Sequence, residues 1–267
     1  MELTVMTFNL RYNTPNDGEN AWPLRVHRVS GIIQDRDPVI VGTQEGYRDM
    51  LIELHGQLPG YEWIGSGRFG GQDNEHCAIF YKNDRVVILE HGQFWLSESP
   101  EEVASKSWDS YFPRICTWAR CRLIAENREF MLYNTHLDHA SQEARDRGIE
   151  VIWSYIITHR SLYGLPAVLM GDMNSFPEHQ PIRFLEEEAK IEGGIDGMPW
   201  LTNAYTVLPA SAGLTAHNFH GGDEGKPIDY IFVSPEISVM ECLVDRRQID
   251  GGYPSDHYPI VARLKLA

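Results

Sequence analysis

The chain has 267 residues, with 38 acidic and 23 basic side chains and a formal net charge of −15. This length and an ordinary apolar content exclude a disordered chain, and no apolar stretch is long enough to span a membrane. The acidic balance and the lack of a run of Lys or Arg count against a protein that tracks long duplex DNA.

Short β-rich runs alternate with helical patterns along the chain. In chain order we predict a strand at 3–8, a helix from Trp22 capped by Asn20, strands at 39–43, 77–81, 85–89, 117–123 and 130–135, a helix from Ser141, a strand at 167–170, a helix over 179–188, and strands at 228–233 and 260–266. Asn83-Asp84 is a plausible hairpin turn between the third and fourth strands. Strands that outnumber dispersed helices predict an α/β sandwich, with sheets packed together and helices outside.

No repeat, low-complexity tract or linker divides the sequence, so we expect one domain over residues 1–267. The four cysteines, Cys77, Cys116, Cys121 and Cys242, are too scattered for a disulfide scaffold or a zinc motif. We expect them to be reduced and buried. The N-terminal residues lack the features of a signal peptide, which predicts a cytoplasmic protein, although a precursor trimmed for secretion would look the same.

Polar side chains stand at the ends of six predicted strands. They are Asn9, Gln44-Glu45, His136, Asp172 with Asn174, Asp229, and Asp256-His257. Each alone is typical of a turn residue or a solvated cap. If the strands lie side by side, these ends form one rim, and its four carboxylates raise one another's pKa unless a cation is present. Oxygen ligands without cysteine suit Mg²⁺ or Mn²⁺, and such an ion beside two imidazoles suits attack of water on a phosphate ester.

The motifs Asn9, Gln44-Glu45, Asn134-Thr-His136, Gly171-Asp172-Met-Asn174, Ile228-Asp229-Tyr230-Ile231 and Ser255-Asp256-His257, in this order, resemble those of the endonuclease/exonuclease/phosphatase superfamily. The resemblance runs from residue 3 to residue 266, and segments such as Asn20-Ala-Trp-Pro-Leu-Arg25 resemble small bacterial members. The superfamily includes deoxyribonucleases, deadenylases, sphingomyelinases and inositol polyphosphate 5-phosphatases. The resemblance implies a four-layered α/β sandwich, in which two mixed β-sheets pack face to face with helices on both outer sides.

The resemblance also implies how a metal ion and the attacking water are held. Glu45 matches the principal ligand of Mg²⁺ or Mn²⁺, with Asn9 beside the metal and Asp256 in contact with it directly or through water. Asp172 matches the residue that activates the water for in-line attack. Asn174 would form a hydrogen bond with a phosphoryl oxygen or with the same water.

Two histidines complete the implied catalytic set. His257 would donate to a non-bridging oxygen, and Asp229 would hold its tautomer. His136 would contact the phosphate or act as a general acid. Glu75 stands where a glutamate partner of that histidine is expected.

Further residues are candidates for substrate binding, in addition to Asn9, Asn174 and His136. Arg114 would clamp a phosphate, or it forms a surface salt bridge. Trp108 lies in an aromatic segment that would stack on a base or sugar, or that only pins a long loop. Asn218 and Phe219 lie where other members of the superfamily place a substrate-contacting loop.

We therefore expect a Mg²⁺- or Mn²⁺-dependent phosphoester hydrolase, first of all a phosphodiesterase or nuclease acting on a short nucleic acid. The alternatives are a phosphomonoesterase acting on a sugar, inositol or lipid-headgroup phosphate, and an inactive binding module of the same fold. The sequence names no protein partner.

Overall fold

The computed structural model describes residues 2–188 and 201–267, as a sequence of strands and helices that begins and ends with neighbouring strands. The elements are β1 (Glu2–Asn9), η1 (Pro15–Asn20), α1 (Trp22–Arg36), β2 (Ile40–Gln44), α2 (Arg48–Gly56), β3 (Tyr61–Ile64), β4 (Ile79–Lys82), β5 (Val86–Trp95), β6 (Ile115–Leu123), β7 (Arg128–His136), α3 (Gln142–Tyr163), β8 (Ala167–Asp172), α4 (Gln180–Arg183), η2 (Phe184–Glu188), β9 (Thr202–Asn203), η3 (Ala204–Val207), β10 (Asp229–Val233), β11 (Ile237–Val244) and β12 (Ile260–Leu266). Within these residues, no helix combines the length and the apolar character needed to cross a bilayer.

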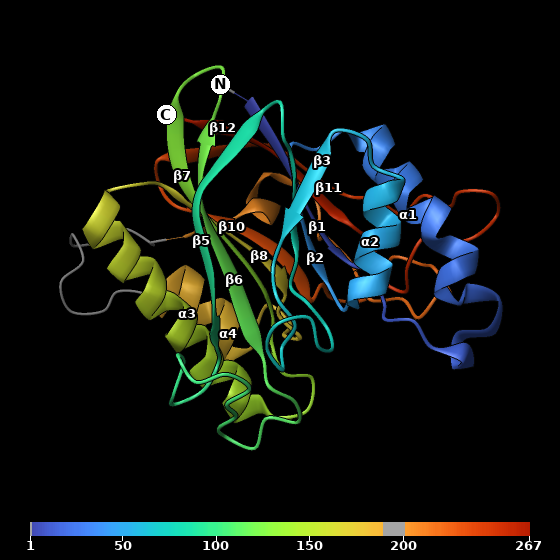
Figure 1. The fold of residues 1–267 in the computed structure, drawn as a ribbon, viewed down its shortest axis with the longest axis horizontal. Coiled ribbons are helices and arrows are strands. Elements are labelled where there is room, and N and C mark those ends of the chain that lie inside the picture. Colours follow the sequence, from blue (N-terminus) through green and yellow to red (C-terminus); the bar gives the residue numbers. More distant parts are fainter. Residues whose placement is uncertain (1, 189–200) are drawn as a thin grey trace.

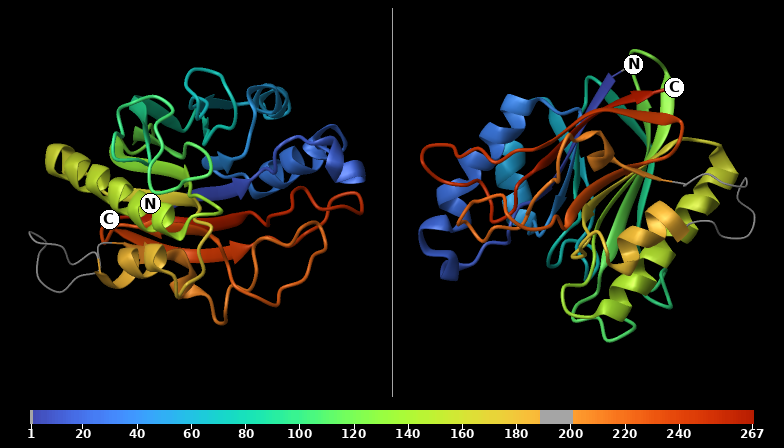
Figure 2. Two further views of the ribbon diagram at one scale, coloured as in Figure 1. Left: turned by 90° about the horizontal axis from the view of Figure 1, so that it is seen from below. Right: turned by 180° about the vertical axis from the view of Figure 1, so that it is seen from behind.

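Two six-stranded sheets pack face to face. One has the order β11-β12-β1-β2-β4-β3, and the other has the order β5-β6-β7-β8-β10-β9. Both are mixed, because β1 pairs in parallel with β2 and β7 pairs in parallel with β8, whereas the other neighbours are antiparallel. Helices α1 and α2 cover the outer face of the first sheet, and α3 and α4 lie outside the second (Figures 1 and 2). The predicted four-layered α/β sandwich is confirmed.

Three layers of apolar side chains lie between the four layers of helices and sheets, because the side chains of each strand point alternately to its two faces. In β1, Leu3 and Val5 point into the core between the sheets, whereas Met6 and Phe8 pack against the helix side. In β10, Ile231 likewise faces the other sheet, while its neighbours on either side belong to the core under α3. Because successive side chains of a strand point to opposite faces, apolar residues at consecutive positions require a sheet that is buried on both faces.

The strand ends that carry the predicted site meet at one edge of the sandwich. Asn9 lies opposite Gln44 in the parallel pair β1–β2, and His136 lies opposite Asp172 in the parallel pair β7–β8. Asp229 opens β10 directly opposite Asp172. The termini of the chain lie at the other end of the strands (Figure 1).

The expected hairpin at Asn83-Asp84 is wrong, because β4 and β5 belong to different sheets. Asn83 N still donates to Gly60 O at 3.0 Å beside the first sheet, whereas Arg85 O already accepts from Ile124 N at 2.9 Å in the second. The turn therefore carries the chain from one sheet to the other. Elements α2, β3, β9 and β11 were not predicted.

Two smaller expectations also differ from the structure. Asn20 does not cap α1, because the cap position is Ala21, which makes no side-chain cap hydrogen bond. All four cysteines are free thiols, and Cys242 is only half-buried because β11 is an edge strand of its sheet. The predicted strands and the long helix α3, which Ser141 caps through Ala144 N, match the structure closely.

Gly171 allows β7 and β8 to approach closely just before Asp172. Its φ is +149°, and an added Cβ would lie 2.0 Å from Thr135 O. We expect Gly171→Ala to lower the free energy of unfolding by about 3 kcal/mol or more, because the strand pairing must be pushed apart. Urea denaturation checks this.

Gly56→Ala serves as the control for that substitution. Gly56 is the last residue of α2, and no atom lies within 4 Å of an added Cβ. Its replacement should leave the free energy of unfolding within about 0.5 kcal/mol of the wild-type value. Equal losses in the two variants would contradict the proposed role of Gly171.

Candidate active site

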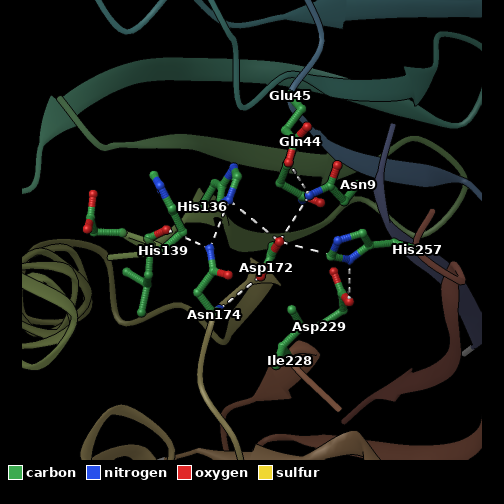
Figure 3. A network of polar contacts seen from close by, with 12 residues as sticks. Asn9, Gln44, Glu45, His136, His139, Asp172, Asn174, Ile228, Asp229 and His257 are labelled. Atoms are coloured by element: carbon green, nitrogen blue, oxygen red, sulfur yellow. Dashed lines mark hydrogen bonds and ion pairs between the residues drawn. The ribbon is translucent and has the colours of Figure 1, made fainter. Parts of the chain in front are cut away.

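A cavity of about 620 Å³ lies at the edge of the sandwich where the polar strand ends meet. Its walls include nine of the predicted site residues, namely Glu45, Glu75, Arg114, His136, Asp172, Asn174, Asn218, Asp256 and His257. They come from both sheets and from the loops between them, so the cavity forms only when the sandwich is complete. Figure 3 shows Asp172 at the centre of a polar network that reaches Asn9, His136, Asn174 and His257.

Asn9, at the end of β1, links carboxylates that belong to the two different sheets. Its Nδ2 donates to Glu45 Oε1 at 3.0 Å and to Asp172 Oδ2 at 3.0 Å. Its Oδ1 accepts from Arg11 N at 2.9 Å, which fixes the orientation of the amide. Both hydrogens of one buried amide group therefore hold two acidic side chains at a set separation.

Glu45 follows β2 in an unusual backbone conformation. Its φ is +62°, in the left-handed region that a non-glycine residue adopts at a cost of about 1–3 kcal/mol. In this conformation Glu45 Oε2 accepts from Tyr12 N at 3.0 Å, while Oε1 accepts from Asn9. Two hydrogen bonds thus aim the carboxylate at the cavity.

Asp172 is the most deeply buried acid in the cavity wall, with 1 % of its surface exposed. Burial, and next the negative charge of Asp229, raise its pKa to about 7. Asn174 N, at 2.9 Å, and the Asn9 amide stabilise the ionised form and oppose this rise. A carboxyl group with a pKa near neutrality is suited to accept a proton from water.

His257 is held by Asp229, as predicted. Its Nδ1 lies 2.9 Å from Asp229 Oδ2, and Thr215 Oγ1 donates to the same oxygen at 2.6 Å. Burial lowers the pKa of His257, but the carboxylates of Asp229, Asp172 and Asp256 together outweigh this cost and hold the pKa well above its ordinary value. The imidazole is therefore protonated at neutral pH and carries a positive charge at the cavity wall.

His136, in contrast, is neutral. Burial, and next the positive charges of Arg114 and Arg68, hold its pKa well below the ordinary value. Its Nε2 lies 3.0 Å from Asn174 Nδ2 and 3.5 Å from Asp172 Oδ2, whereas its buried Nδ1 has no partner among the described residues. A neutral imidazole in this position can exchange hydrogen bonds with a phosphate but carries no charge.

The predicted pairing of Glu75 with His136 is absent from the structure. Glu75 instead forms a two-pronged ion pair with Arg68, at 2.8 and 3.0 Å. Arg68 also donates to Asn74 Oδ1 at 2.7 Å and stacks on the ring of Phe112 at 4.0 Å. Burial raises the pKa of Glu75, and the adjacent guanidinium opposes that rise.

Arg114 lines the cavity as predicted, but a carboxylate also neutralises its charge. Its Nε lies 3.5 Å from Asp138 Oδ2, and its NH2 lies 2.8 Å from His139 Nδ1. Only 5 % of Arg114 is exposed, so it is not part of a surface salt bridge.

Sequence reasoning missed Arg68, Phe112, Tyr12 and Tyr47, which all line the cavity. Arg68 lies in a loop without a motif, so no signal pointed to it. Phe112 lies in the aromatic segment that the sequence singled out.

Three predicted substrate residues, Asn9, Trp108 and Phe219, do not line the cavity. Trp108 lines a separate surface hollow with Glu98 and Glu143, and its carbonyl accepts from Ser141 Oγ at 2.7 Å. This contact is made by the backbone of Trp108, and it ties the loop to the residue that caps α3. The ring of Phe219 lies over the guanidinium of Arg25 at 5.7 Å, while its neighbour Asn218 reaches the cavity wall.

The acidic side of the cavity fits a divalent cation. Ligand atoms of Glu45, His136 and Asp172 lie within 4.8 Å of one another. Asp256 lines the same cavity, and burial raises its pKa, with the charge of Glu45 adding to the rise. Crowded carboxylates with raised pKa values favour a bound cation, and their oxygen atoms suit a hard ion.

Comparisons with known proteins agree with this site. The model of the Endonuclease/Exonuclease/phosphatase family matches residues 6–257. The solved structure of a member from Bacteroides thetaiotaomicron is 32% identical, with a TM-score of 0.90, over 99% of this chain and 95% of that chain. A mannosyl-6-phosphatase from the same species is also 32% identical, with a TM-score of 0.90, over 99% of this chain and 100% of that one.

A more distant structure shares the fold alone. TDP2 from D. rerio, complexed with single strand DNA product, is 15% identical with a TM-score of 0.74, over 99% of each chain. No curated protein matches the chain. The fold, the site and the family model lead to one conclusion: the chain belongs to the endonuclease/exonuclease/phosphatase family, whose members hydrolyse phosphoesters.

Proposed function

We propose that this protein is a divalent-metal-dependent phosphomonoesterase that acts on a neutral, sugar-like molecule carrying one phosphate. The observation that carries the proposal is the charge balance of the cavity. Arg68 and Arg114, opposite the acidic side, are each paired with a carboxylate, from Glu75 and Asp138. A polynucleotide or a polyphosphate requires surplus cations to neutralise its further phosphates.

The remaining walls suit the neutral part of such a substrate. Phe112, Tyr12 and Tyr47 present rings, and Asn74 and Asn218 present amides. Aromatic side chains can cover the apolar faces of a sugar ring, and amide side chains can form hydrogen bonds with its hydroxyl groups. Together they make a suitable surface for a sugar. The 32% identity to a protein named mannosyl-6-phosphatase supports the same substrate class.

The chain's own residues perform the steps of hydrolysis. Glu45 and Asp256 would hold Mg²⁺ or Mn²⁺, which when bound supplies positive charge to the phosphoryl oxygens. The amide of Asn9 is committed to Arg11, Glu45 and Asp172 and would position the carboxylates instead. Asp172 accepts a proton from the attacking water as the oxygen of that water bonds to phosphorus. The bond to the leaving oxygen breaks, and the leaving oxygen keeps the electron pair and takes a proton from solvent, which gives the free alcohol and phosphate. The protonated His257 stabilises the growing negative charge. The neutral state of His136 favours contact with the phosphate over the role of general acid.

The expectation of a phosphodiesterase or nuclease stays a prediction with less support. The relative bound to DNA shares only the fold with this chain. The arrangement of Asn9, Asp172 and His257 counts against an inactive binding module, because such a module has no need for a buried acid with a raised pKa.

Substrate comparison tests the proposal. With Mg²⁺ or Mn²⁺ we expect hydrolysis of hexose 6-phosphates, little turnover of an aryl phosphodiester or a single-stranded oligonucleotide, and no activity with a chelator. Asp172→Asn should lower kcat about 10²- to 10⁴-fold on the preferred substrate, because the proton acceptor is lost. Release of phosphate and release of aryl alcohol measure these rates. Faster cleavage of the diester or oligonucleotide would overturn the phosphomonoesterase assignment.

The same substitution should stabilise the metal-free protein at alkaline pH. Because the pKa of Asp172 is raised to about 7 on folding, the folded state binds more protons than the unfolded state between about pH 4 and pH 7. The stability of the wild type therefore falls as the pH rises through this range. Metal-free Asp172→Asn should melt several degrees higher than the wild type at pH 8, and the difference should shrink at pH 5. Thermal unfolding in a chelator measures this, and a pH-independent difference would contradict it.

Phe112 and Tyr111 form a matched pair for testing sugar recognition. Phe112 lines the cavity, whereas Tyr111 is exposed and touches Phe112 edge-on, with ring centroids 4.7 Å apart. We expect Phe112→Ala to raise KM for a hexose phosphate about tenfold, through loss of ring contact worth about 1.4 kcal/mol. Tyr111→Ala should leave KM unchanged, and glycerol phosphate should respond less to either variant. Equal KM changes in both variants would count against contact between Phe112 and the sugar.

A further inference from the structure

Arg25, in the first turns of α1, places a positive charge in the interior without an acidic partner. It is 0% exposed, and in the described part of the chain no carboxylate forms an ion pair with it. Its Nε donates to Asn20 O at 2.8 Å, and NH1 donates to Leu10 O at 2.5 Å and to Pro254 O at 2.9 Å. NH2 donates to Arg11 O at 2.6 Å. All four hydrogen bonds thus end on backbone carbonyls.

These carbonyls belong to segments that carry site residues. Leu10 and Arg11 directly follow Asn9, and Pro254 stands two residues before Asp256. A further hydrogen bond joins the same two segments, since Ser255 Oγ donates to Asn9 O at 2.7 Å. The third segment, which ends at Asn20, carries Asp17, the ion-pair partner of Arg11.

The chemistry of this contact requires a guanidinium. Its planar fork presents donors in fixed directions and bonds three separate segments at once, which a lysine ammonium on a flexible stem cannot reproduce. Trp22 and Phe219 pack against the group at 5.1 and 5.7 Å and exclude water. Burial lowers the pKa of Arg25 to about 10, so the side chain stays charged at neutral pH.

We propose that Arg25 is a positioning residue for the reaction: it fixes the segment that carries Asn9 against the segment that carries Asp256 and His257. The inference rests on the proposed metal-dependent hydrolysis, because one segment carries the amide that holds Glu45 and Asp172, and the other carries Asp256 and the imidazole of His257. Small displacements of such groups cost large factors in rate.

Arg25→Lys tests this role with the charge retained. We expect kcat to fall about 100-fold with KM changed less than threefold, and the affinity for Mn²⁺ measured by calorimetry to fall about tenfold. Arg28→Lys is the matched control, since Arg28 lies one turn further along the same helix and is half-buried. It should match the wild type in both measurements.

Chemical rescue separates positioning from folding. In Arg25→Ala, added methylguanidinium should restore kcat at least tenfold at a concentration that leaves the wild type unaffected. Circular dichroism and thermal unfolding of each variant give the folded fraction. The proposal is overturned if folded Arg25→Lys keeps wild-type kcat and Mn²⁺ affinity, or if rescue raises the melting temperature without raising kcat. Failure of the proposed function would instead appear as a wild type without phosphoesterase activity, and the Mn²⁺ measurements would still decide the role of Arg25.

Discussion

The site depends on a single amide group that lies between two carboxylates. Asn9 donates one hydrogen bond to Glu45 from its own sheet and one to Asp172 from the other sheet. Without these bonds the buried Asp172 and the half-buried Glu45 would face each other as like charges with nothing between them, at a cost that rises as water is excluded. The amide thus sets how closely the two sheets can approach at their polar edge, and the rest of the rim is arranged around that distance.

Charge is divided unevenly around the cavity. On one side stand carboxylates whose crowding favours a cation, and on the other side Arg68 and Arg114 are each balanced by an acid. A phosphate can bridge the two sides, because one offers room for a metal ion and the other offers fixed donors. The whole chain carries a formal charge of −15, so long polyanions are repelled by the protein surface as well.

Much of the centre of the candidate active site could be predicted from sequence, because its residues stand directly at strand ends. Asp172 and Asp229 occupy paired positions of adjacent strands, so two correctly placed strands were enough to bring them together. The part of the cavity wall that is built from loops could not be predicted in this way. Glu75 pairs with Arg68, and that choice depends on a loop fold that no periodicity encodes. The prediction of a hairpin at Asn83-Asp84 was wrong for a related reason, since a turn motif does not determine which sheet the next strand will join.

The pairing of β1 with β12 has a consequence for synthesis on the ribosome. Glu2 lies opposite Lys265, and β1 occupies an interior position of its sheet, so β1 can complete its pairing only after β12 has been made. Until then one edge of β1 stays open to solvent, and the segment with Asp256 and His257 has no anchored place beside Asn9. Such long-range pairing is slow to form and exposes an edge that can bind other chains. The open edge of β1 therefore needs protection from aggregation until β12 has been made.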